Sequence, residues 1–351
     1  MSAREPSNAR PAIPGATPSP ALSPTPGPTP GVVGRIQQLW HYPVKSMVGQ
    51  QTDSAIITRA GMLGDRGWIV RDEENNENTV VRTLPKLLLF AAEYVAPVRD
   101  NRIPDVRITF PDGSSAQSAD PDINQRLSTA LGKPVSLWSL QPKRHWQHYR
   151  LRSVMGSKDM KRMFASKDLP DFSSISWKLL SELMLFSTPL GRYYDVYPLH
   201  LITTGALQQM QQIEPEGDFG AHRFRPNIVI ESQAGVTGFD DVAWVGGKLH
   251  IGDELVIAVE SRTVRCSMPA QPQQGAGKDS RVLRAIDRHA NRHFGVNATV
   301  IKAGTVNVGD QVRWQPVPRS ALARGVQAVS GRAKNTVSHG LLNLVDRLLK
   351  P

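Results

Sequence analysis

The segment "HRFRPNIVIE" (residues 222–231) changes in its middle from basic side chains to the β-branched residues that strands prefer. Pro226 favours an extended backbone at the residue before it. An extended chain would place Arg223 and Arg225 on one face and Phe224 on the other. We therefore expect a strand entered by two arginines on the same side, where a guanidinium could bind a phosphate through two hydrogen bonds. A solvated rim of a sheet is the alternative.

Short apolar runs of the same kind recur on both sides of this segment, separated by turn formers such as "PDGS" (111–114). Many short strands with few helices are typical of barrels and sandwiches. We therefore predict a mostly β protein, built from a β-barrel domain and an N-terminal β-barrel-like domain with a few helices. The predicted strands contain "GWIV" (67–70), "VRITF" (106–110), "PVSLWSL" (134–140), "HLITT" (200–204), "ELVIAVE" (254–260), "ATVI" (298–301) and "QVRW" (311–314).

Helical patterns are rarer. Residues 122–132 form one expected helix, which Gly132 ends. Thr203 or Thr204 is placed to cap a second helix at 205–213, and its N-terminus could face an anion, so both threonines are candidate cofactor-binding residues. A third helix is predicted from an apolar stripe that recurs every four residues, at Val282, Ile286, Ala290 and Phe294.

Composition divides the chain into five parts. Residues 1–31 hold nine prolines and cannot bury a core, so we expect a disordered leader. An N-terminal β domain follows at 32–140, then a basic connector or insertion at 141–192. The second β domain covers 193–315, and a basic tail with an amphipathic helix occupies 316–351.

The charge is strongly positive and unevenly distributed. The formal net charge is +11 and the pI is about 9.9, which favours an anionic partner. Residues 141–167 carry eight Lys/Arg against one acid, and residues 316–351 carry six against one. A solvated basic face is the alternative for each. Neither segment contains a recognisable nucleic-acid-binding module, so we expect no nucleic-acid partner. The helix predicted at 336–349 could dock on its own domain, on a partner or on a membrane surface.

Several classes of protein are excluded by what the sequence lacks. No run of about 18 uncharged apolar residues suggests a transmembrane helix, and the N-terminus lacks the pattern of a signal peptide. We expect a cytoplasmic protein. Cys266 is the single cysteine among 351 residues. It permits neither an internal disulfide nor a multi-cysteine zinc site nor a cysteine-ligated iron–sulfur cluster.

Three further features could carry chemistry. Lys45 and Ser46 lie side by side in "HYPVKSMVG" (41–49), and Arg66 lies between an acid and a glycine in "GDRGW" (64–68). Exposed loop cations are the alternative for these. Arg265 directly precedes Cys266, and a neighbouring cation favours the thiolate form of a cysteine. A buried, inert thiol is the alternative there.

These features occur together in an order that resembles a known family. "VGRIQQLWHYPVKSMVG", "AGMLGDRGWIV" and "VRTLPKLLLFAAEY" resemble the N-terminal β-barrel domain of MOSC proteins. "RFRPNIVIE", "RCSMPAQPQ" and "GTVNVGDQVRW" resemble the MOSC domain itself. The resemblance covers about residues 33–315 and leaves out both ends of the chain.

The resemblance implies a molybdenum cofactor, a pterin whose dithiolene holds molybdenum and whose tail ends in phosphate. It makes Cys266 the candidate catalytic residue, as the ligand of molybdenum. The chemistry agrees, because a soft thiolate suits this metal and cations suit phosphate. The residues that the resemblance assigns to the pterin and its anionic end are Lys45, Ser46, Arg66, Arg225 and Asn227.

The resemblance further implies an oxidoreductase that reduces N-hydroxylated or N-oxide small molecules. Electrons would come from a separate donor, such as a ferredoxin, a flavoprotein or a small haem protein. The loop after Cys266 departs from the family's reductases, because "SMPAQP" (267–272) stands where they have threonines and an Asp-Pro-Asp-Thr-Gly-like turn. Two alternatives therefore stay open: a carrier of cofactor or sulfur without turnover of its own, and a basic interaction protein that has lost the cofactor.

Overall fold

The computed structural model describes residues 31–79, 83–99, 102–152, 155–164, 167–173, 175–236, 238–318 and 321–349. The leader predicted at 1–31 lies outside these ranges, except for Gly31, where the first strand begins. Among the described residues, no helix combines the length and the apolar character needed to cross a membrane.

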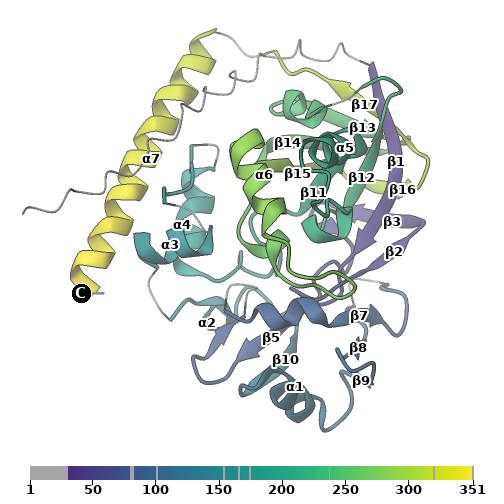
Figure 1. Ribbon diagram of the computed structural model, residues 1–351, viewed down its shortest axis with the longest axis vertical. Coiled ribbons are helices and arrows are strands. Elements are labelled where there is room, and N and C mark those ends of the chain that lie inside the picture. Colours follow the sequence, from purple (N-terminus) through teal and green to yellow (C-terminus); the bar gives the residue numbers. More distant parts are fainter. Residues whose placement is uncertain are drawn as a thin grey trace, which may run out of the picture.

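Seven strands close into a barrel, which confirms the mostly β prediction (Figure 1). The order around the barrel is β12-β11-β15-β14-β13-β17-β1, and pairing of β1 with β12 closes it. Only the β11–β12 pair among these neighbours is parallel. The bounds are β1 (Gly31–His41), β11 (Leu199–Thr203), β12 (Ile228–Ser232), β13 (Lys248–Ile251), β14 (Leu255–Val264), β15 (His293–Lys302) and β17 (Gln311–Gln315).

Alternate side chains of these strands fill the barrel, as the two-residue period of a strand requires. The fully buried residues include Ile36, Leu39, Leu201, Ile230, Leu249 and Ile257. Gly34 sits where β1 crosses β12, and a Cβ there would lie 2.1 Å from the Glu231 carbonyl oxygen. Closure of the barrel therefore requires a glycine at this crossing.

The N-terminal region is tied to the barrel and also has a core of its own. β1 and β2 (Gln50–Thr52) belong to the barrel sheet, and β3 (Ser54–Thr58) pairs with β4 (Gly61–Met62) and with β16 (Gly304–Asn307). Two further three-stranded sheets surround a separate apolar core that contains Val70, Leu87, Phe90, Ile108 and Leu127. They consist of β5 (Trp68–Asp72), β6 (Glu77–Asn78) and β10 (Val135–Ser139), and of β7 (Ala91–Tyr94), β8 (Val106–Thr109) and β9 (Ser115–Gln117).

The predicted helix at 122–132 is confirmed as α1 (Ile123–Leu131). It ends at Gly132, whose backbone is left-handed with φ 72° and whose N–H donates to the Ser128 carbonyl at 2.8 Å. Glycine is favoured at the end of a helix such as α1 because it has no Cβ to oppose positive φ.

A short 3₁₀ helix, η1 (Pro85–Leu89), contributes Leu87 and Leu88 to the buried side of this region.

The helices of the second half lie on the outside of the barrel (Figure 1). They are α5 (Thr204–Ile213), α6 (Ser280–Ala290) and the 3₁₀ turns η2 (Ala221–Phe224), η3 (Asp240–Trp244) and η4 (Met268–Ala270). The predicted stripe is correct for Val282, Ile286 and Ala290 but wrong for Phe294. Asn291 ends α6 in a left-handed conformation, so Phe294 belongs to β15 although it joins the same apolar cluster.

The basic segment 141–192 and the tail combine into a helical cap, which we define as α3 (Ser157–Met163), α4 (Trp177–Leu185) and α7 (Ala321–Leu349). A short helix, α2 (Trp146–Tyr149), precedes the cap. The tail helix is longer than predicted, since it begins at Ala321. Leu342 of α7 is buried with Met160 and Leu180, so one face of α7 docks on its own protein (Figure 1).

Candidate functional site

Tyr42 lies at the centre of a buried cluster of charges. Its ring has the guanidinium of Arg225 at 4.2 Å and that of Arg66 at 4.9 Å from the ring centre. Its hydroxyl donates a hydrogen bond to the Pro226 carbonyl at 2.9 Å. Cation–π contacts of this kind gain strength when they are shielded from water. The ring therefore holds together two arginines that would otherwise repel each other.

Asp65 joins three loops around this ring. One carboxylate oxygen accepts from the Tyr42 backbone N–H at 3.0 Å, and the other accepts from the Asn227 side chain at 3.1 Å and from Arg66. Asn227 in turn accepts from the His200 backbone N–H at 3.2 Å. The polar groups of the Asn227 side chain are thus engaged inside the protein, where they connect the loop at Asp65 with β11 and β12.

Lys45 is buried and links the cluster to an exposed carboxylate. Its ammonium donates to the Tyr193 carbonyl at 2.8 Å and pairs with Asp195. Burial lowers the pKa of Lys45, and the Asp195 carboxylate opposes that change. The Asp195 side chain is 79% exposed. Desolvation raises the pKa of its carboxyl, but the positive charges of Lys45, Arg66 and Arg225 outweigh that effect and lower the pKa. Asp195 is therefore the exposed carboxylate toward which the buried cations are gathered.

Arg225 is the part of the cluster that the protein leaves incomplete. Its Nη1 donates to the Met47 carbonyl, but its buried Nη2 has no hydrogen-bond partner among the described residues. Burial, followed by the charge of Arg66, lowers the pKa of Arg225 to about 10. A buried donor without an acceptor is costly, so this atom indicates a missing anionic or polar group.

The charges of the cluster do not balance. Lys45, Arg66 and Arg225 supply three positive charges, whereas Asp65 and Asp195 supply two negative ones. Buried charges are stable only when they are paired. The imbalance and the free donor together indicate a site for an anion.

Three residues of the cluster, Ser46, Arg66 and Arg225, adopt left-handed backbones, and the backbone of Arg225 corrects the sequence interpretation. Arg225 has φ 53° instead of the predicted extended conformation, because η2 ends there. Arg223 and Arg225 consequently point to different places rather than to one face. Ser46 also has positive φ, at 70°, and is buried beside Lys45. Strained backbones of this kind persist where surrounding contacts hold them, often at functional sites.

Cys266 follows β14 and lies within electrostatic reach of the cluster. Burial raises the pKa of its thiol, the carboxylate of Asp195 raises it further, and Arg265 lowers it only partly. Arg265 lowers the pKa of the thiol, as expected of a neighbouring cation, but desolvation outweighs it. Its guanidinium is turned inward, where it donates to the Phe294 carbonyl at 2.8 Å, to the Phe224 carbonyl at 3.1 Å, and contacts His200 Nε2 at 2.6 Å. These contacts fix the backbone that carries Cys266.

Thr203 and Thr204 are not brought together with the cluster. Thr203 caps α5 by accepting from the Ala206 N–H at 3.1 Å, and it donates to Asp240 at 2.6 Å. Thr204 accepts from the Ser232 N–H at 3.0 Å. The predicted cap is confirmed at Thr203, and both hydroxyls have partners within the protein.

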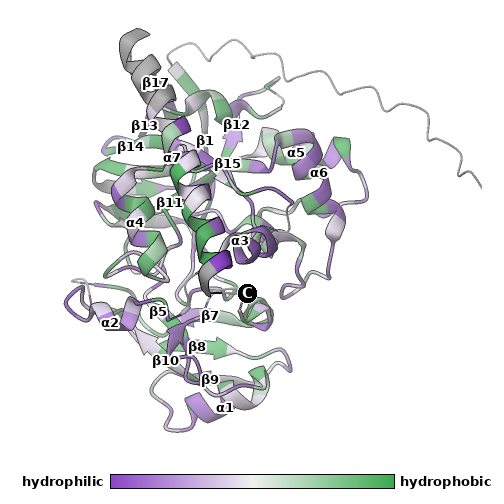
Figure 2. Ribbon diagram, turned by 90° about the vertical axis from the view of Figure 1, so that its left-hand side faces the viewer, coloured by the Kyte–Doolittle hydropathy of each residue, from purple (hydrophilic) through white to green (hydrophobic). Residues whose placement is uncertain are grey.

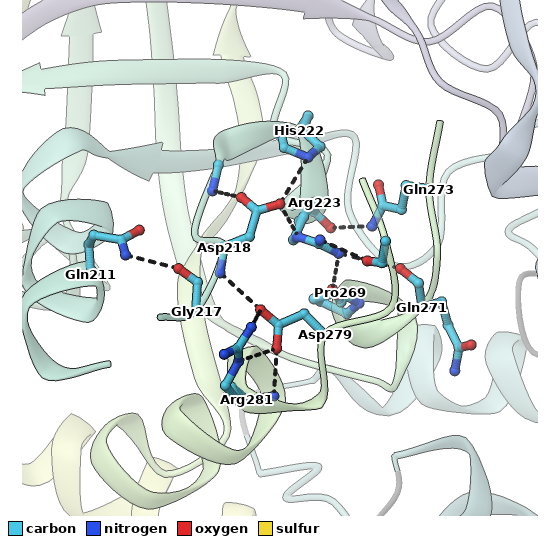
Figure 3. Close-up of polar contacts among 12 residues, drawn as sticks. Gln211, Gly217, Asp218, His222, Arg223, Pro269, Gln271, Gln273, Asp279 and Arg281 are labelled. Atoms are coloured by element: carbon cyan, nitrogen blue, oxygen red, sulfur yellow. Dashed lines mark hydrogen bonds and ion pairs between the residues drawn. The ribbon is translucent and has the colours of Figure 1, made fainter. Parts of the chain in front are cut away.

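Arg223 holds the loop that follows Cys266 (Figure 3). Its Nη2 donates to the Gly277 carbonyl at 2.9 Å, and its Nη1 donates to the Pro269 and Gln271 carbonyls at 3.2 and 3.4 Å. Its Nε donates to Asp218 at 2.8 Å. One buried side chain therefore binds three carbonyls of a loop rich in proline and glycine, in addition to the backbone hydrogen bonds of the loop itself.

Sequence analysis missed Tyr42, Asp65, Asp195 and the role of Arg223. Tyr42 and Asp65 lie in the same motifs as Lys45 and Arg66, so their nearness in the sequence is a signal that could have identified them. Asp195 has no local signature. Only the fold brings it beside Lys45.

The comparisons with known proteins agree with this architecture. Residues 33–143 match the model of the MOSC N-terminal beta barrel domain, and residues 192–313 match the MOSC domain. The chain therefore belongs to the proteins that combine these two domains.

Several known proteins are similar to this chain over most of its length. Human mitochondrial amidoxime reducing component 2 is 27% identical over 309 residues, which cover 80% of this chain and 83% of the relative. Mouse mitochondrial amidoxime-reducing component 1 is 27% identical over 318 residues, with 80% and 82% covered. The crystal structure of the YuaD protein from Bacillus subtilis is similar with a TM-score of 0.39 and 11% identity, over 82% of this chain and 98% of that one.

Replacement of Arg223 by methionine tests its role as the clamp of this loop. The variant keeps an apolar stem but leaves three carbonyls without donors, so the free energy of unfolding should fall by about 2–4 kcal/mol. Amide hydrogen exchange across residues 267–277 should rise at the same time. Arg107→Met is the matched control, because the ion pair of Arg107 with Glu93 is exposed on both sides, and such pairs contribute less than about 1 kcal/mol. Equal loop exchange in the two variants would contradict the clamp.

Proposed function

We propose that this chain binds a molybdenum cofactor in the cluster around Tyr42 and reduces nitrogen–oxygen bonds of small molecules. The observation that carries the proposal is the buried Nη2 of Arg225, which has no partner in the part of the chain that the structure describes, within a cluster of excess positive charge. The family assignment supports it, because similar chains are amidoxime-reducing components. The coarser conclusion, a MOSC protein with an anion site beside a cysteine, does not depend on the choice of substrate.

The residues present fit such a cofactor. Lys45, Arg66 and Arg225 offer cations to a phosphate, and Arg225 keeps a free donor for it. The thiol of Cys266 is a soft ligand suited to molybdenum. Deprotonation of this thiol is unfavourable while the site contains only protein, since burial raises its pKa. A metal cation bound next to the thiol would instead favour the thiolate form of Cys266.

Each part of the cluster would then have a distinct task. The molybdenum cofactor supplies two-electron redox chemistry when it is bound. Asn227 and Asp65 orient Tyr42 and Arg66 through the contacts described above. The exposed carboxylate of Asp195 is held next to Lys45, where it can accept a hydrogen bond from the N–H or O–H of a substrate.

The electrons would come from a separate protein. One cysteine assigned to molybdenum leaves none for a cysteine-ligated cluster in this sequence. The donor would be a ferredoxin, a flavoprotein or a small haem protein. The basic side chains of residues 143–167 favour an acidic donor, because complementary charge raises association rates.

Substitution Cys266→Ser tests the ligand assignment. A hydroxyl is a harder and much less acidic ligand than a thiol, so reduction of an amidoxime should be abolished and the molybdenum spectrum should change. The thermal unfolding midpoint should stay close to that of the parent, which shows that the fold survives. Full turnover in the serine variant would exclude Cys266 as the ligand. A parent protein that holds molybdenum but never turns over with any donor would indicate a cofactor carrier instead.

Substitution Arg225→Ala tests the anion site. Charge-assisted hydrogen bonds contribute roughly 1.5–3 kcal/mol each, so cofactor retention should weaken by about ten- to a hundredfold. Molybdenum and pterin are measured after dialysis in parent and variant. The control is Arg107→Ala, since Arg107 forms an exposed ion pair with Glu93, and this variant should retain cofactor like the parent. Equal occupancy in all three proteins would contradict the role of Arg225.

A further inference from the structure

The net charge of the chain is confined to the helical cap and its flanks. Residues 141–192 contain ten Lys/Arg against four acids, and residues 316–351 contain six against one. These excesses of six and five together equal the net charge of +11 of the whole chain. Residues 1–140 and 193–315 are therefore neutral in sum, and the cap with its flanks is the part that an anionic surface would attract.

The inner face of α7 uses its polar groups to hold the cap together. Lys334 donates to the Ile175 carbonyl at 2.8 Å, and Asp346 accepts from the Ser157 hydroxyl and from the Lys158 N–H, the latter at 2.9 Å. Asp346 is the single acid of residues 316–351. Because this carboxylate is bound to α3, it does not offset the cations on the outside of the helix.

A second side of α7 is apolar and exposed. Val337, Leu341 and Leu344 are 56%, 48% and 47% exposed, and their spacing of four and three residues places them in one stripe. Figure 2 looks onto α7 from outside and shows hydrophobic residues along the helix. The basic side chain of Arg347 is exposed one turn beyond Leu344. The stripe is thus apolar with a cation at its edge.

α4 adds two more large apolar side chains to the cap. Trp177 is 49% exposed at its first turn and Leu185 is 60% exposed at its end. Lys178, beside Trp177, is exposed as well. Leucine or valine with tryptophan and flanking lysine or arginine is the composition of helices that lie in the interface of a membrane.

We propose that the helical cap docks on an anionic lipid surface, with the stripe of α7 inserted among the lipids and the cations of the cap against the headgroups. An acidic protein would be attracted by the same charge, but attraction of that kind does not need the five exposed apolar side chains. An anionic lipid surface would attract the cations of the cap and would also bury the apolar stripe of α7. This proposal is independent of molybdenum chemistry, because it uses no residue of the cluster around Tyr42.

The test uses the full chain and vesicles of two compositions, phosphatidylcholine alone and phosphatidylcholine with about one-third phosphatidylglycerol. The parent should float with the anionic vesicles, bind the neutral ones much less, and be released as ionic strength rises. The double variant Leu341→Gln, Leu344→Gln should bind at least about tenfold more weakly, since two half-exposed leucines would no longer enter the lipid. Its unfolding midpoint should match that of the parent, because the buried face of α7 is untouched.

The matched control is Ile56→Gln, Val308→Gln, which removes two exposed apolar side chains outside the cap. This control should bind vesicles like the parent. Equal binding of the parent and the α7 variant to anionic vesicles would overturn the proposal. Equal binding of the parent to neutral and anionic vesicles would overturn it as well. If the α7 variant keeps its vesicle binding but slows reduction by an acidic donor protein, the apolar stripe of α7 is a protein-docking surface and the lipid proposal is wrong.

Discussion

The carboxylate of Asp65 is the constraint on which the candidate site depends. It accepts hydrogen bonds from the Tyr42 backbone, from Asn227 and from Arg66, and so connects the chain after β1 with the entrance of β12. β1 is also the strand that closes the barrel. The contacts that complete the fold and those that gather the buried cations are therefore made by the same short segments.

This arrangement explains why the architecture could be predicted from the sequence, whereas the geometry of the site could be predicted only in part. Strands such as β8 and β14 follow from local patterns of β-branched residues, and α1 follows from its pattern and from Gly132. The participation of β1 in the barrel of the second β domain could not be predicted, because pairing between strands about two hundred residues apart leaves no local signal. For the same reason the sequence gives no indication of Asp195, because only the tertiary structure brings it into contact with Lys45.

The two arginines near β12 show where a local rule failed. The residue before a proline is normally extended, yet Arg225 is left-handed. Contacts of its side chain with Tyr42 and with the Met47 carbonyl accompany this conformation. The resulting turn separates Arg225, which faces the anion site, from Arg223, which holds the loop after Cys266. Arg223 supplies that loop with three hydrogen bonds.

The central claim is that the cluster around Tyr42 is completed by a molybdenum cofactor. The most direct measurement is the molybdenum and pterin content of the full chain, purified from cells that make the cofactor. The account predicts stoichiometric amounts of both, retained through purification because the cations of the cluster and the thiol of Cys266 hold them together. A folded protein from such cells that contains neither molybdenum nor pterin would contradict it.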